Sequence, residues 1–414
     1  MRKGLGRHNY RSAGGPQPSL VLDFAGTGTL DPRVTFTRST TGTYYNSSGV
    51  LTTAAINAPR FDYNPSTLAP LGLLIEQSST NILLNSNYGG AQSNGLTVIN
   101  NSVTSIDGTT TATTVTQTSA TSSHNLYTSF TAITNTNYTH SVFIKAGTNR
   151  YVSVGIGNFT GQAFITVDTT TFTSTQTITQ GSGVTYVSSS IVISANGFYR
   201  ISLTANCISV GLACIVGLNN TSTPATADAS FSGNGTSNAY VTGAQLEALA
   251  FPTSYIPTTS AQVTRASDNA SMTGTNFSSW YNTSQGTWFA QVNMLSTAGT
   301  PRIVGATPSS KAPMEISNQA AAMFDNVFGV STANNITANT TQKIATVWTG
   351  TTGQVCLNGG TVATGSQLNG YADLSTIGIG YNSTSNNNFI NGRIAKITYY
   401  PTVLNSAQLQ ALTT

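Results

Sequence analysis

Short runs of alternating apolar and polar residues, separated by turn-forming residues, recur along most of the chain. Every second side chain of a strand faces the same side of a sheet, so such runs predict half-buried strands. Gly, Asn and Asp between the runs predict turns, and strands spaced in this way are typical of a two-sheet sandwich. The clearest runs are 137–145, 151–154, 163–167, 184–187, 191–193 and 198–203.

Strand-like runs also lie on both sides of this region. Before it, short runs occur between residues 19 and 51, joined by turns. After it, Trp288 stands in an apolar run over 286–292 and is expected to face a core, and Asn358-Gly359-Gly360 predicts a hairpin. We therefore expect an all-β chain, with two tandem β-sandwich (jelly-roll) domains after a short loop-rich β N-terminal module and a flexible basic arm.

Proline positions and composition divide the chain into segments. Pro252 and Pro257, followed by the polar run 258–262, predict a linker after a strand, because neither proline has a free amide donor. Residues 266–414 should then fold without the rest. The expected segments are a basic arm over 1–16, a β module over 17–90, a jelly roll over 91–258 and a second sandwich over 259–414.

Charge is scarce and unevenly placed. Charged residues make up 7% of the chain and hydrophobic residues 38%, which is enough to build packed cores. The 16 basic and 12 acidic residues give a net charge of +4, and the arm accounts for all of it, through Arg2, Lys3, Arg7 and Arg11. The folded body is therefore neutral, and we expect no nucleic-acid partner. The arm is either a frayed terminus or a flexible docking peptide.

Few residues suit catalysis or metal binding. No nucleophile, zinc-protease or phosphate-loop motif stands in a fitting context, and a glycosidase pair of Glu247 with Asp228 or Asp168 is the one carboxylate arrangement to consider. We expect no enzyme, no cofactor and no metal, and no apolar run is long enough to span a membrane. Three cysteines without metal-site spacing are expected to be buried reduced thiols: Cys207, Cys214 and Cys356.

The N-terminal third contains four motifs in a recognisable order. They are Thr35-Phe36-Thr37-Arg38, the run from Pro59 to Pro65, Gly72-Leu73-Leu74-Ile75-Glu76, and Thr80 to Ser86. This order resembles the N-terminal module of many tailed-bacteriophage virion proteins, and it departs from that pattern at Ser78 and Ser79, where a basic residue is common. Four charged residues of the segment are expected to satisfy one another beneath a loop-rich surface: Arg38, Arg60, Asp62 and Glu76.

Two further resemblances concern the rest of the chain. The run from Gly243 to Glu247, with Phe251 to Thr258 and then Thr264-Arg265, resembles the end of a carbohydrate-binding-module-like jelly roll in the same phage proteins. The runs 389–400 and 404–412 resemble the closing strand and short helix of concanavalin A-like (laminin G-type) lectin domains. Asn405 or Ser406 is expected to cap that helix.

These resemblances imply a bacteriophage virion structural protein, a surface fibre, tail or head appendage that binds host-surface glycan through its sandwiches. Its partners would be other virion proteins (capsid, portal or tail) and further copies of itself, with a trimer as the first expectation and no membrane insertion. It would be assembled in the host cytoplasm and exposed on the particle surface. The alternatives are a capsid or tail decoration (cement) protein that binds no glycan, and a capsule depolymerase.

Two sets of residues are the candidate sites. Docking to the particle is assigned to Arg2, Lys3, Arg7 and Arg11 of the arm. Glycan binding is assigned to one loop, since an aromatic face can stack on sugar C–H groups while amides bind hydroxyls: Tyr381, Asn382, Asn386, Asn387 and Asn388. An ordinary solvated loop is the alternative there. Three cations are expected to lie along a sheet edge or to contact a ligand: Lys145, Arg150 and Arg200.

Overall fold

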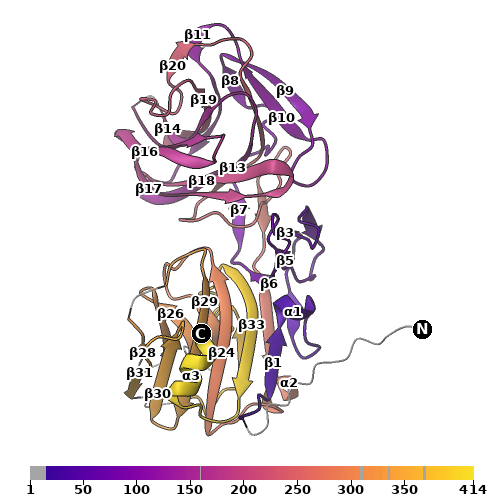
Figure 1. Cartoon of the computed structure of the whole chain (residues 1–414), viewed down its shortest axis with the longest axis vertical. Coiled ribbons are helices and arrows are strands. Elements are labelled where there is room, and N and C mark those ends of the chain that lie inside the picture. Colours follow the sequence, from indigo (N-terminus) through magenta and orange to yellow (C-terminus); the bar gives the residue numbers. More distant parts are fainter. Residues whose placement is uncertain are drawn as a thin grey trace, which may run out of the picture.

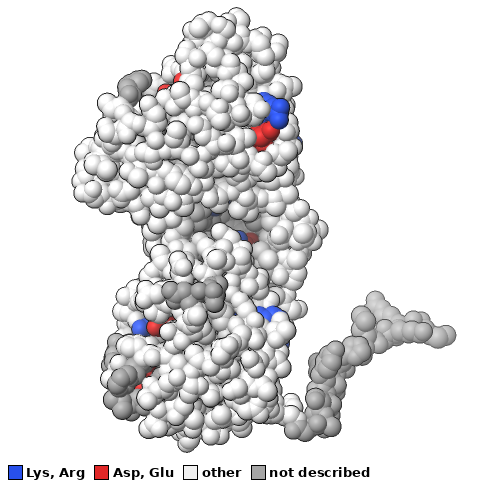
Figure 2. All heavy atoms as spheres, turned by 60° about the vertical axis from the view of Figure 1, so that its left-hand side comes forward, with Lys and Arg blue, Asp and Glu red and all other residues white. Residues whose placement is uncertain are grey.

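The computed structural model describes residues 15–158, 160–307, 311–325, 327, 329–333, 336–366 and 370–414. The chain forms two β-sandwiches stacked along the long axis of the molecule, the upper and the lower sandwich (Figure 1). Charged side chains are sparse on the face drawn in Figure 2. The docking residues Arg2, Lys3, Arg7 and Arg11 lie outside the described residues, so that assignment stays a prediction. The helical segments are α1 (Phe24–Thr27), η1 (Ala195–Gly197), α2 (Thr275–Ser278) and α3 (Ser406–Thr413).

The upper sandwich consists of two six-stranded antiparallel sheets. The strands of the first, in spatial order, are β17 (Val184–Ile193), β18 (Phe198–Cys207), β13 (Thr136–Ala146), β21 (Asn238–Glu247), β10 (Ala112–Gln117) and β9 (Leu96–Val103). Those of the second are β16 (Thr173–Gly181), β15 (Gly161–Asp168), β14 (Tyr151–Asn158), β19 (Gly211–Asn219), β12 (Asn125–Thr131) and β8 (Gln92–Asn94). A small pair, β11 (Thr121–Ser123) and β20 (Ser230–Ser232), lies beside them.

The lower sandwich also has two antiparallel sheets. The eight-stranded sheet contains β31 (Ala363–Ser366), β30 (Thr352–Leu357), β29 (Thr341–Thr349), β24 (Gln285–Met294), β33 (Gly392–Tyr400), β6 (Pro70–Ile75), β5 (Phe61–Tyr63) and β1 (Leu20–Asp23). The seven-stranded sheet contains β2 (Thr35–Thr37), β23 (Asn269–Thr273), β32 (Thr376–Ile379), β25 (Arg302–Thr307), β26 (Ala312–Ser317), β27 (Ala320–Phe324) and β28 (Gly329–Ser331). Two short pairs complete the fold: β3 (Gly42–Tyr45) with β4 (Leu51–Ala54), and β7 (Ser79–Asn81) with β22 (Val263–Arg265).

Alternation located several of the upper strands correctly. The predicted run 137–145 is β13, and β14, β15 and β18 contain the runs predicted at their positions. The two runs at 184–187 and 191–193 are one strand, β17, with an irregular register against β18 between Tyr186 and Ser188. The all-β class is confirmed.

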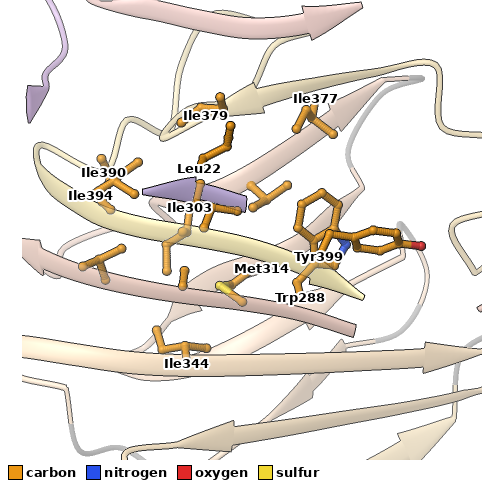
Figure 3. Close-up of a cluster of buried hydrophobic side chains, with 14 of the residues drawn as sticks. Leu22, Trp288, Ile303, Met314, Ile344, Ile377, Ile379, Ile390, Ile394 and Tyr399 are labelled. Atoms are coloured by element: carbon orange, nitrogen blue, oxygen red, sulfur yellow. The ribbon is translucent and has the colours of Figure 1, made fainter. Parts of the chain in front are cut away.

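The N-terminal segment 17–90 is not a separate module. β1 and β6 pair with β33, and β2 pairs with β23, so these short strands extend the sheets of the lower sandwich. Leu22 of β1 lies in the same buried cluster as Trp288 and Tyr399 (Figure 3). Such short strands cannot bury an apolar face by themselves, which is why they add to a larger sheet. The expected division between residues 17–90 and 259–414 is therefore wrong, because both segments form the lower sandwich.

The upper sandwich is an insertion into the lower one. The chain leaves the lower sandwich through β7 and returns through β22, and these strands pair with each other, Val263 opposite Asn81. Beyond this pair, Ser86 and Thr258 are joined by both backbone and side-chain hydrogen bonds. The predicted linker around Pro257 is thus half of a paired, two-chain connection.

Several local expectations are confirmed. The Asn405 side chain accepts a hydrogen bond from the Gln408 amide at 3.0 Å, and the Gln408 side chain accepts one from the Asn405 amide at 2.9 Å, so a capping box starts α3. Trp288 is fully buried. The cysteines are all buried and free: Cys207, Cys214 and Cys356.

The joint between the sandwiches contains a network of fully buried charges. One terminal guanidinium nitrogen of Arg60 lies 2.7 Å from Glu76 Oε2 and also contacts Asp268 Oδ2. A terminal nitrogen of Arg38 lies 3.0 Å from Asp268 Oδ1. Arg265 lies 3.5 Å from Glu76. Burial would raise the pKa of Glu76, but Arg265 and Arg60 outweigh it and hold that pKa well below its usual range. Charge pairs thus join segments far apart in the sequence.

The predicted mutual pairing of the N-terminal charges is correct for Arg60 with Glu76 only. Arg38 pairs with Asp268, and Asp62 pairs with Arg393 at 2.6 Å, so both partners come from the C-terminal half of the chain. Glu76 is therefore ion-paired although serines stand at positions 78 and 79.

We predict that His140 makes the upper sandwich sensitive to acid. Its side chain is buried, with Nδ1 3.1 Å from the Gly155 carbonyl oxygen, and burial lowers its pKa to about 4. The unfolded chain takes up this proton near pH 6.5. Stability from this group is therefore complete above about pH 6.5 and is lost as the pH falls toward about 4, by up to about 3 kcal/mol. Between pH 7 and about pH 4.5, His140→Gln should lose less free energy of unfolding than the wild type, as measured by denaturant unfolding. Equal losses in the two proteins would contradict this prediction.

Candidate functional site

The predicted glycan loop exists, but its tyrosine faces inward. Tyr381 is 6% exposed, and its ring stacks on Phe389 with centroids 5.4 Å apart and planes 12° from parallel. Asn382 is also buried and bonds through its backbone to Asn386 and Asn387. The prediction that Tyr381 offers a free face to sugar is therefore wrong, because the ring belongs to the lower core. Binding by the other amides stays a prediction; Asn386 and Asn387 are exposed, and Asn388 donates to Thr300.

A pocket of about 500 Å³ lies on the outer face of the second sheet of the upper sandwich. Alternate side chains of each strand in this sheet point away from the core. In β14, for example, Val152 and Val154 are core residues, whereas Ser153 between them is not. We call this hollow the sheet-face pocket. Its lining residues are Asn94, Asn125, Tyr127, Ser129, Phe130, Thr131, Gly157, Asn158, Gln162, Gly211, Leu212, Ala213, Ile215 and Asp228.

One wall of the sheet-face pocket is the loop that follows β19. A methyl group added at Gly217 would stand 1.9 Å from the Ala227 carbonyl oxygen, so only glycine lets the loop lie this close to the sheet. Gln162 accepts a hydrogen bond from the Ala227 amide at 2.9 Å, and its own amide donates to Asp228 at 2.7 Å. The loop is thereby fixed, and it holds Asp228 beside the sheet.

The sheet-face pocket combines an aromatic ring with polar side chains. Tyr127 is half-buried and packs beside the small cluster that contains Phe164 and Ile215. Asn125 is 2% exposed, and its Oδ1 has no hydrogen-bond partner among the described residues. Leaving a buried polar atom unpaired costs about 1–3 kcal/mol. The pocket can therefore bind a molecule that has both apolar C–H faces and hydrogen-bonding groups.

The second hollow, of about 460 Å³, lies between the sandwiches, and we call it the waist groove. Its walls come from both sandwiches and from the connecting segment 252–255. Figure 2 shows this narrow middle of the molecule hollowed, with acidic and basic atoms inside. Asp62 and Arg393, which pair with each other, line it together with Tyr45 and Arg200.

The three cations named from the sequence differ in their surroundings. The Lys145 amine lies 5.9 Å from the centre of the Phe198 ring, and Arg150 forms an ion pair with Asp168 at 2.9 Å. Lys145 and Arg150 therefore fit the expectation that the aliphatic part of the side chain lies along a sheet. Arg200 lines the waist groove instead.

The carboxylate pair considered from the sequence, Glu247 with Asp228 or Asp168, is not brought together in either hollow. Glu247 lines neither hollow; it is buried and accepts hydrogen bonds from Ser79 at 2.6 Å and from Thr253. Within the described ranges, no cluster of three or more His, Cys, Asp or Glu could hold a metal ion. A search of those same residues finds no helix with the length and apolarity needed to cross a membrane.

The fold and the two hollows define a two-sandwich β protein with candidate binding surfaces. No protein-family model and no curated protein match the chain. Among solved structures, it is similar to the CBM40 of Ruminococcus gnavus IT-sialidase bound to α2,3-sialyllactose, with 15% identity, 31% of this chain and 82% of that chain covered, and a TM-score of 0.28.

Two other structural similarities cover more of the chain. Trypanosoma rangeli sialidase in complex with sialic acid has 12% identity, with 73% of this chain and 60% of that chain covered and a TM-score of 0.28. Mouse laminin α1 chain domains LG4-5 have 8% identity, with 68% of this chain and 85% of that chain covered and a TM-score of 0.22. At TM-scores this low, ligand chemistry has to be argued from the residues of this chain.

No pattern in the sequence marks the sheet-face pocket. Asn125 and Tyr127 stand in β12, which the alternation analysis does not predict, and Asp228 follows in a loop that becomes part of the pocket only through tertiary folding. The tyrosines and asparagines are too frequent for any one of them to stand out in the sequence.

Proposed function

We propose that this chain is a glycan-binding structural protein of a bacteriophage virion. The ordered phage-type motifs between Thr35 and Ser86 support the virion role, and the basic arm would anchor the chain to a capsid, portal or tail protein. The two sandwiches would then project from the particle and present the sheet-face pocket to the host surface. Copies of the chain would assemble on the particle, with a trimer as the first expectation.

The observation that carries glycan binding is the combination of Tyr127 and Asn125 in one pocket of sugar size. A sugar ring has one apolar C–H face, which suits the half-buried Tyr127 ring, and hydroxyl groups along its edge, which suit the amide side chains that line the pocket. Asp228 adds a carboxylate, which can only accept hydrogen bonds when ionised.

The same carboxylate indicates which sugars fit. Asp228 accepts a hydrogen bond from Gln162 but pairs with no cation among the described residues, so its negative charge would repel a ligand carboxylate or phosphate. Sugar hydroxyls, in contrast, can donate to it. The proposed ligand of the sheet-face pocket is therefore a neutral, hydroxyl-rich glycan.

A glycan array tests this function. The full chain should bind a subset of neutral glycans, and release of reducing sugar from the bound glycans should stay at background. Absence of binding to every glycan would favour the decoration protein, and sugar release would favour the depolymerase. Imaging labelled protein on phage particles tests the virion role separately from glycan binding.

A further inference from the structure

Arg200 carries a guanidinium group that the protein only partly satisfies. Its two terminal nitrogens donate to the Thr253 carbonyl oxygen at 2.6 Å and to Ser141 Oγ at 2.9 Å. Its Nε has no partner among the described residues, although a guanidinium has five N–H donors in all. No carboxylate of the described chain lies within ion-pair distance of Arg200, whereas Arg393 in the same groove is paired with Asp62.

The waist groove is lined by two guanidinium groups and two carboxylates: Arg200 and Arg393, and Asp62 and Glu76. Asp62 pairs with Arg393, and Glu76 pairs with Arg60 of the buried network. Both carboxylates are almost fully buried. Arg200 is therefore the guanidinium of the lining that has no carboxylate partner within ion-pair distance.

The groove also offers surfaces that suit a sugar ring. Tyr44, Tyr45 and Tyr63 line it, and all three are partly exposed. Asn64 and Asn339 supply amides in the same lining. Aromatic faces beside amides and a guanidinium without a carboxylate partner match a ring that carries hydroxyls and one carboxylate, because a guanidinium fork fits a carboxylate in its plane.

We propose that the waist groove is a second ligand site, which binds an acidic saccharide by placing its carboxylate on Arg200 and its ring against the groove tyrosines. This site goes beyond the proposed function, since it has the opposite charge preference to the sheet-face pocket. The two sites would let one chain recognise an acidic and a neutral unit of a surface polysaccharide.

The experiment is calorimetric titration of the full chain at low salt with an oligosaccharide of glucuronic acid and with its carboxyl-reduced, neutral counterpart. The wild type should bind the acidic oligomer, and raising the salt concentration should weaken binding. Arg200→Gln keeps amide donors but removes the charge and should weaken binding at least tenfold. Tyr127→Ala, in the other pocket, should bind it as the wild type does. Circular dichroism and melting curves establish that each variant is folded.

If Arg200→Gln does not fold, Asn64→Ala replaces it, with an expected weakening of about threefold to tenfold. Unchanged binding by a folded variant, equal binding of the neutral oligomer, or no binding by the wild type would each overturn the proposal. Inorganic phosphate is the competitor: displacement of the oligomer at equal concentration would show a general anion site and overturn the saccharide assignment. Loss of acidic binding in Tyr127→Ala alone would place the acidic ligand in the sheet-face pocket and overturn the assignment to Arg200.

Discussion

A fragment of residues 266–414 is expected to show no cooperative thermal transition, although the linker prolines suggest that it folds alone. It lacks β1 and β6, both of which pair with β33, and it lacks β2 beside β23. Leu22 and Leu73, both buried in the lower core, would be missing as well. Each buried leucine contributes roughly 1.5–3 kcal/mol, and domains are stable by only about 5–15 kcal/mol.

The matched control retains the N-terminal strands and removes the insertion. In it, residues 15–81 are joined to 263–414 by a short Gly-Ser linker, which the pairing of Asn81 with Val263 makes possible. This protein should unfold cooperatively, since both sheets of the lower sandwich are complete. Differential scanning calorimetry compares the two. A cooperative transition in the fragment 266–414 would contradict the shared lower sandwich.

Asp268→Asn is expected to destabilise the protein by about 3–5 kcal/mol, the usual cost of breaking a buried ion pair from one side. The substitution keeps the size of the side chain but removes the charge that faces both Arg38 and Arg60. Asp268 Oδ2 also accepts a hydrogen bond from the Glu76 backbone amide at 3.0 Å. If the asparagine oxygen takes this position, its NH2 group faces Arg38 and cannot accept a hydrogen bond from it. Equilibrium unfolding in urea measures the loss.

Asp31→Asn is the control for Asp268→Asn. Asp31 pairs with Arg33 at 2.7 Å, but the two side chains are 20% and 34% exposed, so the solvent screens the pair. Exposed pairs contribute about 0–1 kcal/mol, and the control should lose no more than that. Similar losses at the two positions would show that the buried network does not stabilise the joint.

The sequence predicts strands well where each strand has one apolar face. β13, β14 and β18 were located because their core residues alternate with others over most of each strand. Alternation says which side of a strand is buried but not which strand lies beside it. The assignment of β1, β2 and β6 to the lower sandwich therefore needed the three-dimensional structure.

Tyr381 shows why the predicted glycan site failed. Gly380, at a φ of +80°, turns the chain directly after β32, and a methyl group added there would stand 2.9 Å from Ile75. The turn sends Tyr381 back against Phe389 instead of out to solvent. A loop rich in asparagine has no alternation that could have revealed this direction.

The most direct test of glycan binding is a titration of the strongest neutral glycan from the array into three proteins: the wild type, Tyr127→Ala and Tyr381→Ala. Removing a stacked ring from a sugar site costs about 1–3 kcal/mol, by analogy with base stacking on aromatic side chains, so Tyr127→Ala should bind at least fivefold more weakly. Tyr381→Ala should bind as the wild type does when both are folded. Unchanged affinity in Tyr127→Ala would contradict binding in the sheet-face pocket.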